Sequence, residues 1–389
     1  MKRGTKTNKI GLLLSAAVAV LAFSAPLPAR AQPHIWRTEV ADGGPNNVGK
    51  SPCLVVDHDG NLHIAYYDET ARALLYTFQP AGGKRWFKMT VAAGDVGDYM
   101  SVAVDAADHP QFSYVSFTER GLFYAHWDGK KWHKQLIDPE SVTYFTSIQL
   151  DSQDHPHISY YHRMQGKAYA LQLKYAHFDG KQWFIETVDQ REGTGKFNSL
   201  AVDSKGDPHI AYSYIGPGDM LYASSNGQHW SFSAIDLSRT TNSFLGAGNS
   251  IAVDAGGIPH VAYWDLNHRT VKYGYWTGTA WKTEVVDKLN AIAEQMGAID
   301  HVSLKMDSQG QPHVAYYDAG LGVLKYAVRT SLGWRTEVVD RSGNVGMYPS
   351  LCLDAGDHAY IAYYDVSNNT LKLAREEAVA LAEMPAARK

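Results

Sequence analysis

The chain has 389 residues, 45% of them hydrophobic, and is long enough to bury a large core. Its 36 basic and 40 acidic residues give a net charge of −4, so it lacks the basic excess with which proteins bind nucleic acid. The 12% aromatic content, with 24 Tyr and 10 Trp, favours packed β-structure, where flat rings stack on pleated faces. We therefore expect a large β-rich protein that does not bind nucleic acid.

Residues 1–31 have the pattern of a signal peptide. Four basic residues fall among the first nine, the apolar run 10–23 follows, and Ala29-Arg30-Ala31 offers a small-x-small cleavage motif. The apolar run is short for a membrane span, and no second one follows it. The pattern predicts export to a periplasm or beyond, with a mature chain that begins at Gln32 and has no membrane span.

One sequence unit recurs seven times between residues 32 and 375. Each copy has an Asp at the end of its first predicted strand and a Tyr nine residues later, and successive copies are 46 to 53 residues apart. The Asp residues are Asp57, Asp105, Asp151, Asp203, Asp254, Asp307 and Asp354. The Tyr residues are Tyr66, Tyr114, Tyr160, Tyr212, Tyr263, Tyr316 and Tyr363. This period is typical of propeller blades with four strands each.

The two ends of the repeat region complement each other. Six copies contain a Trp at the start of a fourth strand, but the seventh ends near Ala374 without one. Trp36-Arg37-Thr38-Glu39-Val40 repeats Trp334-Arg335-Thr336-Glu337-Val338 letter for letter. The sequence therefore predicts an all-β, seven-bladed β-propeller of four-stranded antiparallel blades, in which an N-terminal strand completes the last blade.

Cys53 and Cys352 are predicted on the innermost strands of the first and last blades, which ring closure makes neighbours. A disulfide would join the two blades there. However, Cys53 lies four residues before its repeat Asp and Cys352 only two, so their heights differ, and two buried free thiols are the alternative. Residues 376–389 leave the repeat pattern and are expected to form a disordered tail or a short helix.

Comparison of the copies separates scaffold from candidate site. The His of the P-H-I-A-Y-Y motif occurs five times and is interpreted as structural, with a ring nitrogen bonded to neighbouring backbone. The same reasoning assigns the Lys of the L-K-Y-A motif to the scaffold. These His residues are His63, His157, His209, His260 and His313.

The residue that ends the second strand varies more. It is Asp in four copies, where a carboxylate can cap the next turn or, alternatively, contribute to a Ca²⁺ site. Three consecutive blades have Ser116, His162 and Tyr214 there, and Arg163 follows His162. No cofactor or metal is otherwise indicated.

The loops between blades diverge in the same sector, blades 2 to 5. In a propeller, these loops and the loops between strands two and three share one face, where ligands usually bind. Drift of loop residues is the alternative explanation. The polar residues that these loops introduce are Tyr144, Arg191, Lys196, Asn198, Arg239, Asn242, Glu294 and His301.

A His, a Tyr and several cations on one face suit an anionic ligand. They also suit β-elimination from a uronic acid, in which a cation neutralises the carboxylate and His and Tyr move the protons. For that reaction we would assign catalysis to His162, Tyr214 and Arg163.

The P-H-I-A-Y-Y-D and L-K-Y-A repeats resemble those of secreted bacterial seven-bladed β-propellers over nearly all of residues 35–375. That family includes lectin-like modules, interaction scaffolds and enzymes. Propeller polysaccharide lyases, such as those that cut ulvan, use His, Tyr and Arg on the channel face, and His162, Arg163 and Tyr214 are similar in type. The S-x-D-x-G-x-x-W turns of sialidases do not occur in this sequence.

Three hypotheses follow from the sequence. The first is an exported monomeric propeller that binds a glycan, anionic in character, or a protein on the face of blades 2 to 5. The second is a polysaccharide lyase. The third, a purely structural envelope component, leaves the diverged loops unexplained.

Overall fold

A computed structural model of the protein describes Met1 and residues 34–97, 99–139, 142–163, 171–289 and 301–378. One compact unit comprises residues 36–377, and a second comprises residues 1–35 and 378–389. The predicted signal peptide and most of the predicted tail lie outside the described residues. Within the described ranges, no helix has the length and apolarity that a membrane span requires.

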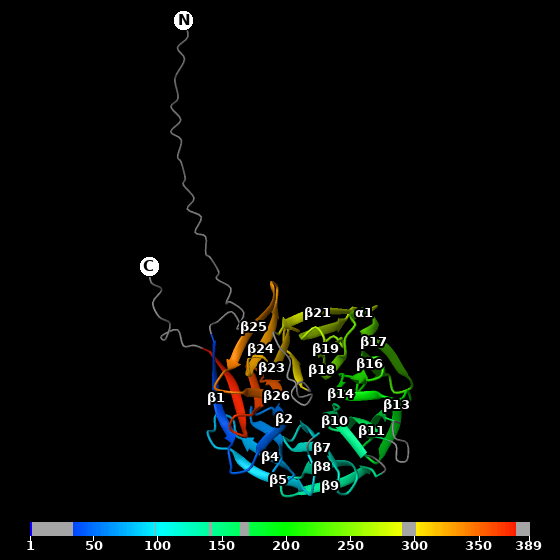
Figure 1. Ribbon diagram of the computed structural model, residues 1–389, viewed down its shortest axis with the longest axis vertical. Coiled ribbons are helices and arrows are strands. Elements are labelled where there is room, and N and C mark those ends of the chain that lie inside the picture. Colours follow the sequence, from blue (N-terminus) through cyan, green and yellow to red (C-terminus); the bar gives the residue numbers. More distant parts are fainter. Residues whose placement is uncertain (2–33, 98, 140–141, 164–170, 290–300, 379–389) are drawn as a thin grey trace. The chain divides into compact units, whose positions relative to one another are not determined.

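The described residues of the first unit form seven four-stranded antiparallel sheets around a central axis, as predicted (Figure 1). The innermost strands are β2 (Val48–Val56), β6 (Ser101–Val104), β10 (Val142–Leu150), β14 (Thr194–Val202), β18 (Leu245–Val253), β22 (Val302–Met306) and β26 (Val345–Leu353). The second strands are β3 (Leu62–Asp68), β7 (Pro110–Ser116), β11 (Pro156–Arg163), β15 (Pro208–Tyr214), β19 (Pro259–Asp265), β23 (Pro312–Asp318) and β27 (Ala359–Asp365).

The outer half of each blade consists of a third and a fourth strand. The third strands are β4 (Ala73–Gln79), β8 (Gly121–Trp127), β12 (Leu171–Phe178), β16 (Asp219–Ser225), β20 (Thr270–Trp276), β24 (Val323–Thr330) and β28 (Thr370–Ala378). The fourth strands are β5 (Phe87–Ala93), β9 (Trp132–Asp138), β13 (Trp183–Asp189), β17 (Trp230–Asp236), β21 (Trp281–Lys288), β25 (Gly333–Asp340) and β1 (His34–Asp42). A short helix, α1 (Ser238–Thr241), follows β17.

The ring closes as the repeated W-R-T-E-V segment predicted. The last sheet has the order β1-β28-β27-β26, so the N-terminal strand completes the seventh blade, and blue β1 lies beside red β28 in Figure 1. An ion pair between Arg375 and Glu39, 2.5 Å apart, connects the two strands. β28 continues to Ala378, three residues beyond the end expected for the repeat.

Four of the seven second strands are buried along their whole length, and the other three nearly so. In β3, β7, β19 and β23 every residue is buried. Neighbouring blades cover both faces of each sheet at this radius, so the strand needs side chains that pack in both directions. This explains why P-H-I-A-Y-Y-D lacks the polar alternation of a half-exposed strand.

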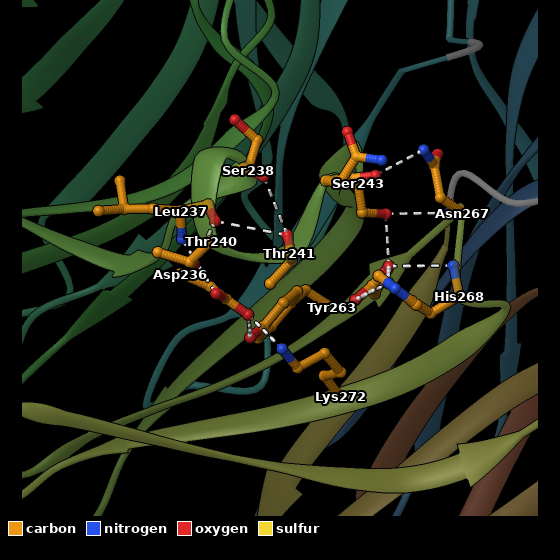
Figure 2. A network of polar contacts seen from close by, with 12 residues as sticks. Asp236, Leu237, Ser238, Thr240, Thr241, Ser243, Tyr263, Asn267, His268 and Lys272 are labelled. Carbon is orange, nitrogen blue, oxygen red and sulfur yellow. Dashed lines mark hydrogen bonds and ion pairs between the residues drawn. The ribbon is translucent and has the colours of Figure 1, made fainter.

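An Asp at the end of the fourth strand joins each blade to the next. Asp236 accepts hydrogen bonds from Tyr263 and Lys272 of the following blade (Figure 2). The repeat Tyr donates to such an Asp at six of the interfaces among the described residues, over 2.5–2.9 Å. The Lys of the third strand joins the same Asp at four of them. The repeated Tyr and Lys therefore hold neighbouring blades together.

The interface between blades 1 and 2 is built differently. Ala93 ends the fourth strand of blade 1, so Tyr114 meets no carboxylate at this position. The third strand of blade 2 has Phe123 in place of Lys, and its ring stacks on Tyr114 with centroids 5.4 Å apart. A buried cation without an anion would be costly, so the Asp and the Lys are lost together.

The motif His is structural, but its partners are side chains rather than the backbone that we expected. In all five copies Nδ1 meets the hydroxyl of a third-strand Tyr. Nε2 faces the repeat Asp at 2.9–3.7 Å. Blade 2 replaces the His by Gln111, whose Oε1 accepts a 2.6 Å hydrogen bond from Tyr124.

A ring of serines joins the innermost strands. A backbone N–H of one blade donates to a Ser Oγ of the preceding blade, over 2.9–3.2 Å, in five places. Cys53 takes the Ser position in blade 1 and receives the N–H of Val102. The sequence comparison did not single out these serines.

We predict that Tyr363→Phe destabilises the protein by about 1.5–3 kcal/mol, because it removes a buried hydrogen bond to the Asp340 carboxylate. Tyr114→Phe is the matched control, since Tyr114 meets Phe123 instead of a carboxylate, and should change stability little. Urea denaturation of both variants measures the difference. Equal losses would contradict the role given to the carboxylate.

We predict that His157→Gln weakens the dependence of stability on pH. Burial lowers the pKa of His157 to about 4. Below about pH 6.5 the unfolded chain therefore binds a proton at this residue that the folded chain does not bind. Stability is therefore lost as the pH falls from about 6.5 to about 4. Gln111 shows that the site accepts glutamine. The free energies of unfolding from urea denaturation at pH 7 and pH 5 should differ less in the variant, by on the order of 1 kcal/mol. An unchanged difference would contradict the assignment.

Candidate functional site

The candidate site lies where the seven innermost strands begin, at the mouth of the central channel. A cavity of about 180 Å³ is lined there by residues from all seven blades. Most blades contribute two or three consecutive residues to the lining. The last of these residues is the ring serine, or Cys53 in blade 1. The cavity lies on the side of the loops between blades, which is the face predicted to bind ligands.

An arc of aromatic rings borders the cavity in blades 2 to 4. Tyr99 contacts Tyr144 and Phe145, with centroids 5.5 and 4.5 Å apart, and Phe145 contacts Phe197 at 4.8 Å. Lys196 places its ammonium group 4.4 Å from the centre of the Phe197 ring. Of these residues, the sequence analysis had selected Tyr144 and Lys196. It missed the three other rings.

The backbone is strained where the strands enter the channel. Phe145, Phe197, Tyr348 and Ser51 all have positive φ angles, between 48° and 55°. Non-glycine residues rarely adopt this conformation, and it occurs often at functional sites. Residues with this conformation lie where the strand pairing shifts its register, for example between Tyr144 and Ser147. These irregularities aim the rings at the mouth of the channel.

His162 lies within the interface between blades 2 and 3. It is buried, and its Nδ1 lies 4.0 Å from the carboxylate of Asp138. Asp138 also binds Lys174 and accepts a 2.8 Å hydrogen bond from Tyr160, and these contacts hold the pKa of the Asp138 carboxyl below its usual value. In blade 6 the equivalent of His162 is Asp318, 3.7 Å from its Lys. His162 therefore replaces one of two carboxylates beside a buried Lys.

Tyr161 and Arg163 flank His162 on the same strand. The Tyr161 hydroxyl is buried without a hydrogen-bond partner among the described residues. In blade 7 the equivalent Tyr364 donates to Asn47 at 2.7 Å. Arg163 is exposed at the end of β11. The sequence analysis did not select Tyr161.

Arg191 and Tyr214 meet in blade 4. The guanidinium lies 5.1 Å from the centre of the Tyr214 ring and forms a two-pronged contact with Asp189. Asp189 also accepts the Tyr212 hydroxyl at 2.9 Å. The third strand has Leu221 where four other blades have Lys, so Arg191 supplies the cation that this interface otherwise lacks. Half of its side chain remains exposed.

Asn198 and His301 line the cavity. The Asn198 amide is fully used in joining strands, since its oxygen accepts from Ser159 at 2.6 Å and its nitrogen donates to two carbonyls. The Nδ1 atom of His301 is buried without a partner among the described residues. Burial lowers the pKa of His301 to about 4, so the ring is neutral near pH 7.

The remaining predicted residues lie farther from the channel or cannot be placed. Arg239 is exposed on α1, whose Ser238 and Thr240 appear in the polar network of Figure 2, and Asn242 caps that helix. Glu294 lies outside the described residues. The carboxylates that end second strands cap turns, as when Asp68 accepts the N–H of Ala71 at 2.8 Å. A Ca²⁺ site at these positions stays a prediction.

Cys53 and Cys352 are both free thiols. Cys53 is paired with Ala65 and Cys352 with Tyr360, so Cys352 lies two positions deeper along the inner strands than Cys53. That offset, about 7 Å of strand, separates the two side chains, and the alternative of two free thiols is the one observed.

No protein-family model and no curated protein matches this sequence. Solved structures do match its fold. An ulvan lyase, described as a new polysaccharide lyase family, aligns with a TM-score of 0.63 and 12% identity over 87% of this chain and 95% of its own. The polysaccharide lyase Uly1 aligns with a TM-score of 0.55 and 9% identity, covering 86% and 90%. An oligogalacturonate lyase solved with manganese aligns with a TM-score of 0.54 and 14% identity, covering 89% and 97%.

These similarities identify the class of the protein. The chain is a seven-bladed β-propeller, and polysaccharide lyases are among the solved propellers that resemble it. At 9–14% identity the likeness concerns the fold alone.

We predict that the two arginines of this face differ in role. Arg191→Met should destabilise the protein by about 3 kcal/mol, because it leaves the buried Asp189 carboxylate without its cation. Arg163→Met, at an exposed strand end, should change stability by less than about 0.5 kcal/mol. Urea denaturation of the two variants tests this. A stable Arg191→Met protein would mean that Arg191 is available to a ligand rather than committed to the interface.

Proposed function

We propose that this protein is exported and, as a monomer, binds an anionic glycan at the channel mouth of blades 2 to 5. The observation that carries this proposal is the aromatic arc with cations beside it. Sugar rings present apolar faces that pack on aromatic side chains, while their carboxylate or sulfate groups pair with Arg and Lys. Phe145 and Tyr144 supply half-buried rings, and Lys196 and Arg163 supply the charges.

A solved structure of similar fold supports the same proposal. The ulvan lyase that this chain resembles in fold was also solved with a bound glucuronate–sulfated rhamnose unit. An acidic polysaccharide is therefore a ligand class that such a propeller can accept. A protein ligand is the alternative, and it would need a broader contact surface than the cavity provides.

We predict that Lys196→Met weakens the binding of acidic polysaccharides about tenfold, or ~1.4 kcal/mol, because it removes a cation next to the aromatic arc. Binding to alginate, ulvan and a neutral glucan can be measured by affinity electrophoresis. Binding should also weaken with added salt, which screens the charges.

Lys134→Met, on the outer strand β9, is the matched control for net charge and should bind as the native protein does. Equal binding of neutral and acidic glycans would contradict the proposed role of charge. If no glycan binds, the proposal is contradicted and a protein ligand becomes the better explanation of this face.

A lyase is the second candidate function. It is favoured by the set Tyr161, His162 and Arg163 on one strand, with a tyrosine hydroxyl that lacks a partner among the described residues. In this scheme Arg163 neutralises the carboxylate of a uronate, and His162 or Tyr161 removes the proton at C5. The electron pair forms the C4–C5 double bond, the bond from C4 to the linking oxygen breaks, and Tyr214 protonates that oxygen.

Turnover separates the two candidates. A lyase releases an unsaturated uronate whose ultraviolet absorbance rises with time, whereas a binding protein releases nothing. If it is a lyase, His162→Ala and Tyr214→Phe should each lower kcat by at least about a hundredfold while polysaccharide binding persists. Binding without any absorbance change on a panel of uronic-acid polysaccharides would exclude the lyase for those substrates.

A further inference from the structure

The ring serines present unused donors to the channel cavity. Ser147, Ser199, Ser250, Ser303 and Ser350 all line it, and each oxygen accepts a backbone N–H from the next blade. The hydroxyl of Ser350 also bonds to Cys53, whereas the hydroxyl protons of the other four serines have no acceptor within the described part of the chain. Hydroxyl groups in this state prefer an acceptor.

A lysine lies one level deeper in the channel. Lys305 follows Ser303 by two residues on β22, so both side chains lie on the same side of the strand. Burial raises the pKa of the Cys53 and Cys352 thiols and the positive charge of Lys305 opposes this, so Lys305 lies near these thiols of blades 1 and 7. Within the described residues no carboxylate pairs with Lys305, and none lines the cavity.

The cavity also has two acceptors without donors. The amide nitrogen of Asn249 donates to the carbonyls of Phe197 and Gly246, which leaves its oxygen buried and without a partner among the described residues. The neutral ring of His301 also has a buried Nδ1 without a partner among the described residues, and this atom is an acceptor when the ring proton is on Nε2. A bare inorganic anion would not satisfy these acceptors, but the hydroxyl groups of a sugar acid would.

We propose that the channel mouth is a binding site for one small oxyanion group, a carboxylate or sulfate, held by the serine hydroxyls above Lys305. The cavity of about 180 Å³ is smaller than the ~300–1,000 Å³ of sites for drug-sized ligands, so it admits a single group or sugar residue. Asn249 and His301 favour a group carried by a sugar over a free inorganic ion. The choice of a sugar as the carrier of this oxyanion group rests on the proposed function. The oxyanion site itself does not.

Calorimetric titration of the native protein with glucuronate, inorganic sulfate and glucose tests the site. We expect glucuronate to bind, and glucose to bind at least about tenfold more weakly. Lys305→Met should weaken glucuronate binding about tenfold, and Lys305→Arg should retain it. Lys282→Met, on the outer strand β21, makes the same charge change outside the channel and should have no effect.

Unchanged glucuronate binding in Lys305→Met would overturn the proposal, as would equal affinity for glucose and glucuronate. Sulfate binding without glucuronate binding would support an oxyanion site for free anions and contradict the sugar source. If an acidic polysaccharide binds through Lys196 but no small anion binds, only the channel site fails. If neither binds, the proposed function fails as well.

Discussion

The contact between one blade and the next depends on a single buried carboxylate. The Asp that ends a fourth strand accepts the hydroxyl of a Tyr and, in most blades, the ammonium group of a Lys from the blade that follows. These charges are stable in the interior only because they are paired and hydrogen-bonded. The face that carries the candidate site is built on these same clusters, so changes to the site must preserve them.

Blades 2 to 4 show how the scaffold has been altered without losing that pairing. Blade 2 replaces the whole charged cluster by two stacked rings, Tyr114 and Phe123. Blade 4 moves the cation from the third strand to Arg191 in a loop, and blade 3 exchanges one carboxylate for His162. These three changes occur in the sector where the loops diverge. Blade 1, outside that sector, also lacks the Lys: Leu75 takes its place, and Lys88 of the fourth strand binds Asp42.

The sequence was sufficient to predict the fold because each copy checks the others. Seven copies, 46 to 53 residues apart, and the repeated W-R-T-E-V segment define the blades and the closure, and both are observed. The candidate site was predicted only in part. The copies marked His162 and Tyr214 as departures, but they gave no sign that Arg191 would be committed to Asp189.

There are physical reasons why the sequence did not reveal the other residues of the site. Phe145 and Phe197 look like ordinary strand residues, and only the irregular pairing with positive φ turns them to the channel. The ring serines recur four residues before the repeat Asp, so a comparison of the copies could have found them, although their bonds join positions about fifty residues apart. A second signal was available: Asp is lost at Ala93 and Lys is lost at Phe123, and this joint loss points to a contact between blades.

The closing strand has a consequence for the order of folding. β1 is made first, yet its partner β28 is made last, and Arg375 and Glu39 are 336 positions apart. Contacts so distant in sequence form slowly. Until they form, β28 presents an open strand edge, and the first blade presents an uncovered apolar face. Tyr66 of the first blade also finds its carboxylate, Asp42, on β1. A chain interrupted before its last blade therefore lacks more than one blade: it has an unclosed ring whose exposed edges favour aggregation, so cooperativity extends over the whole propeller.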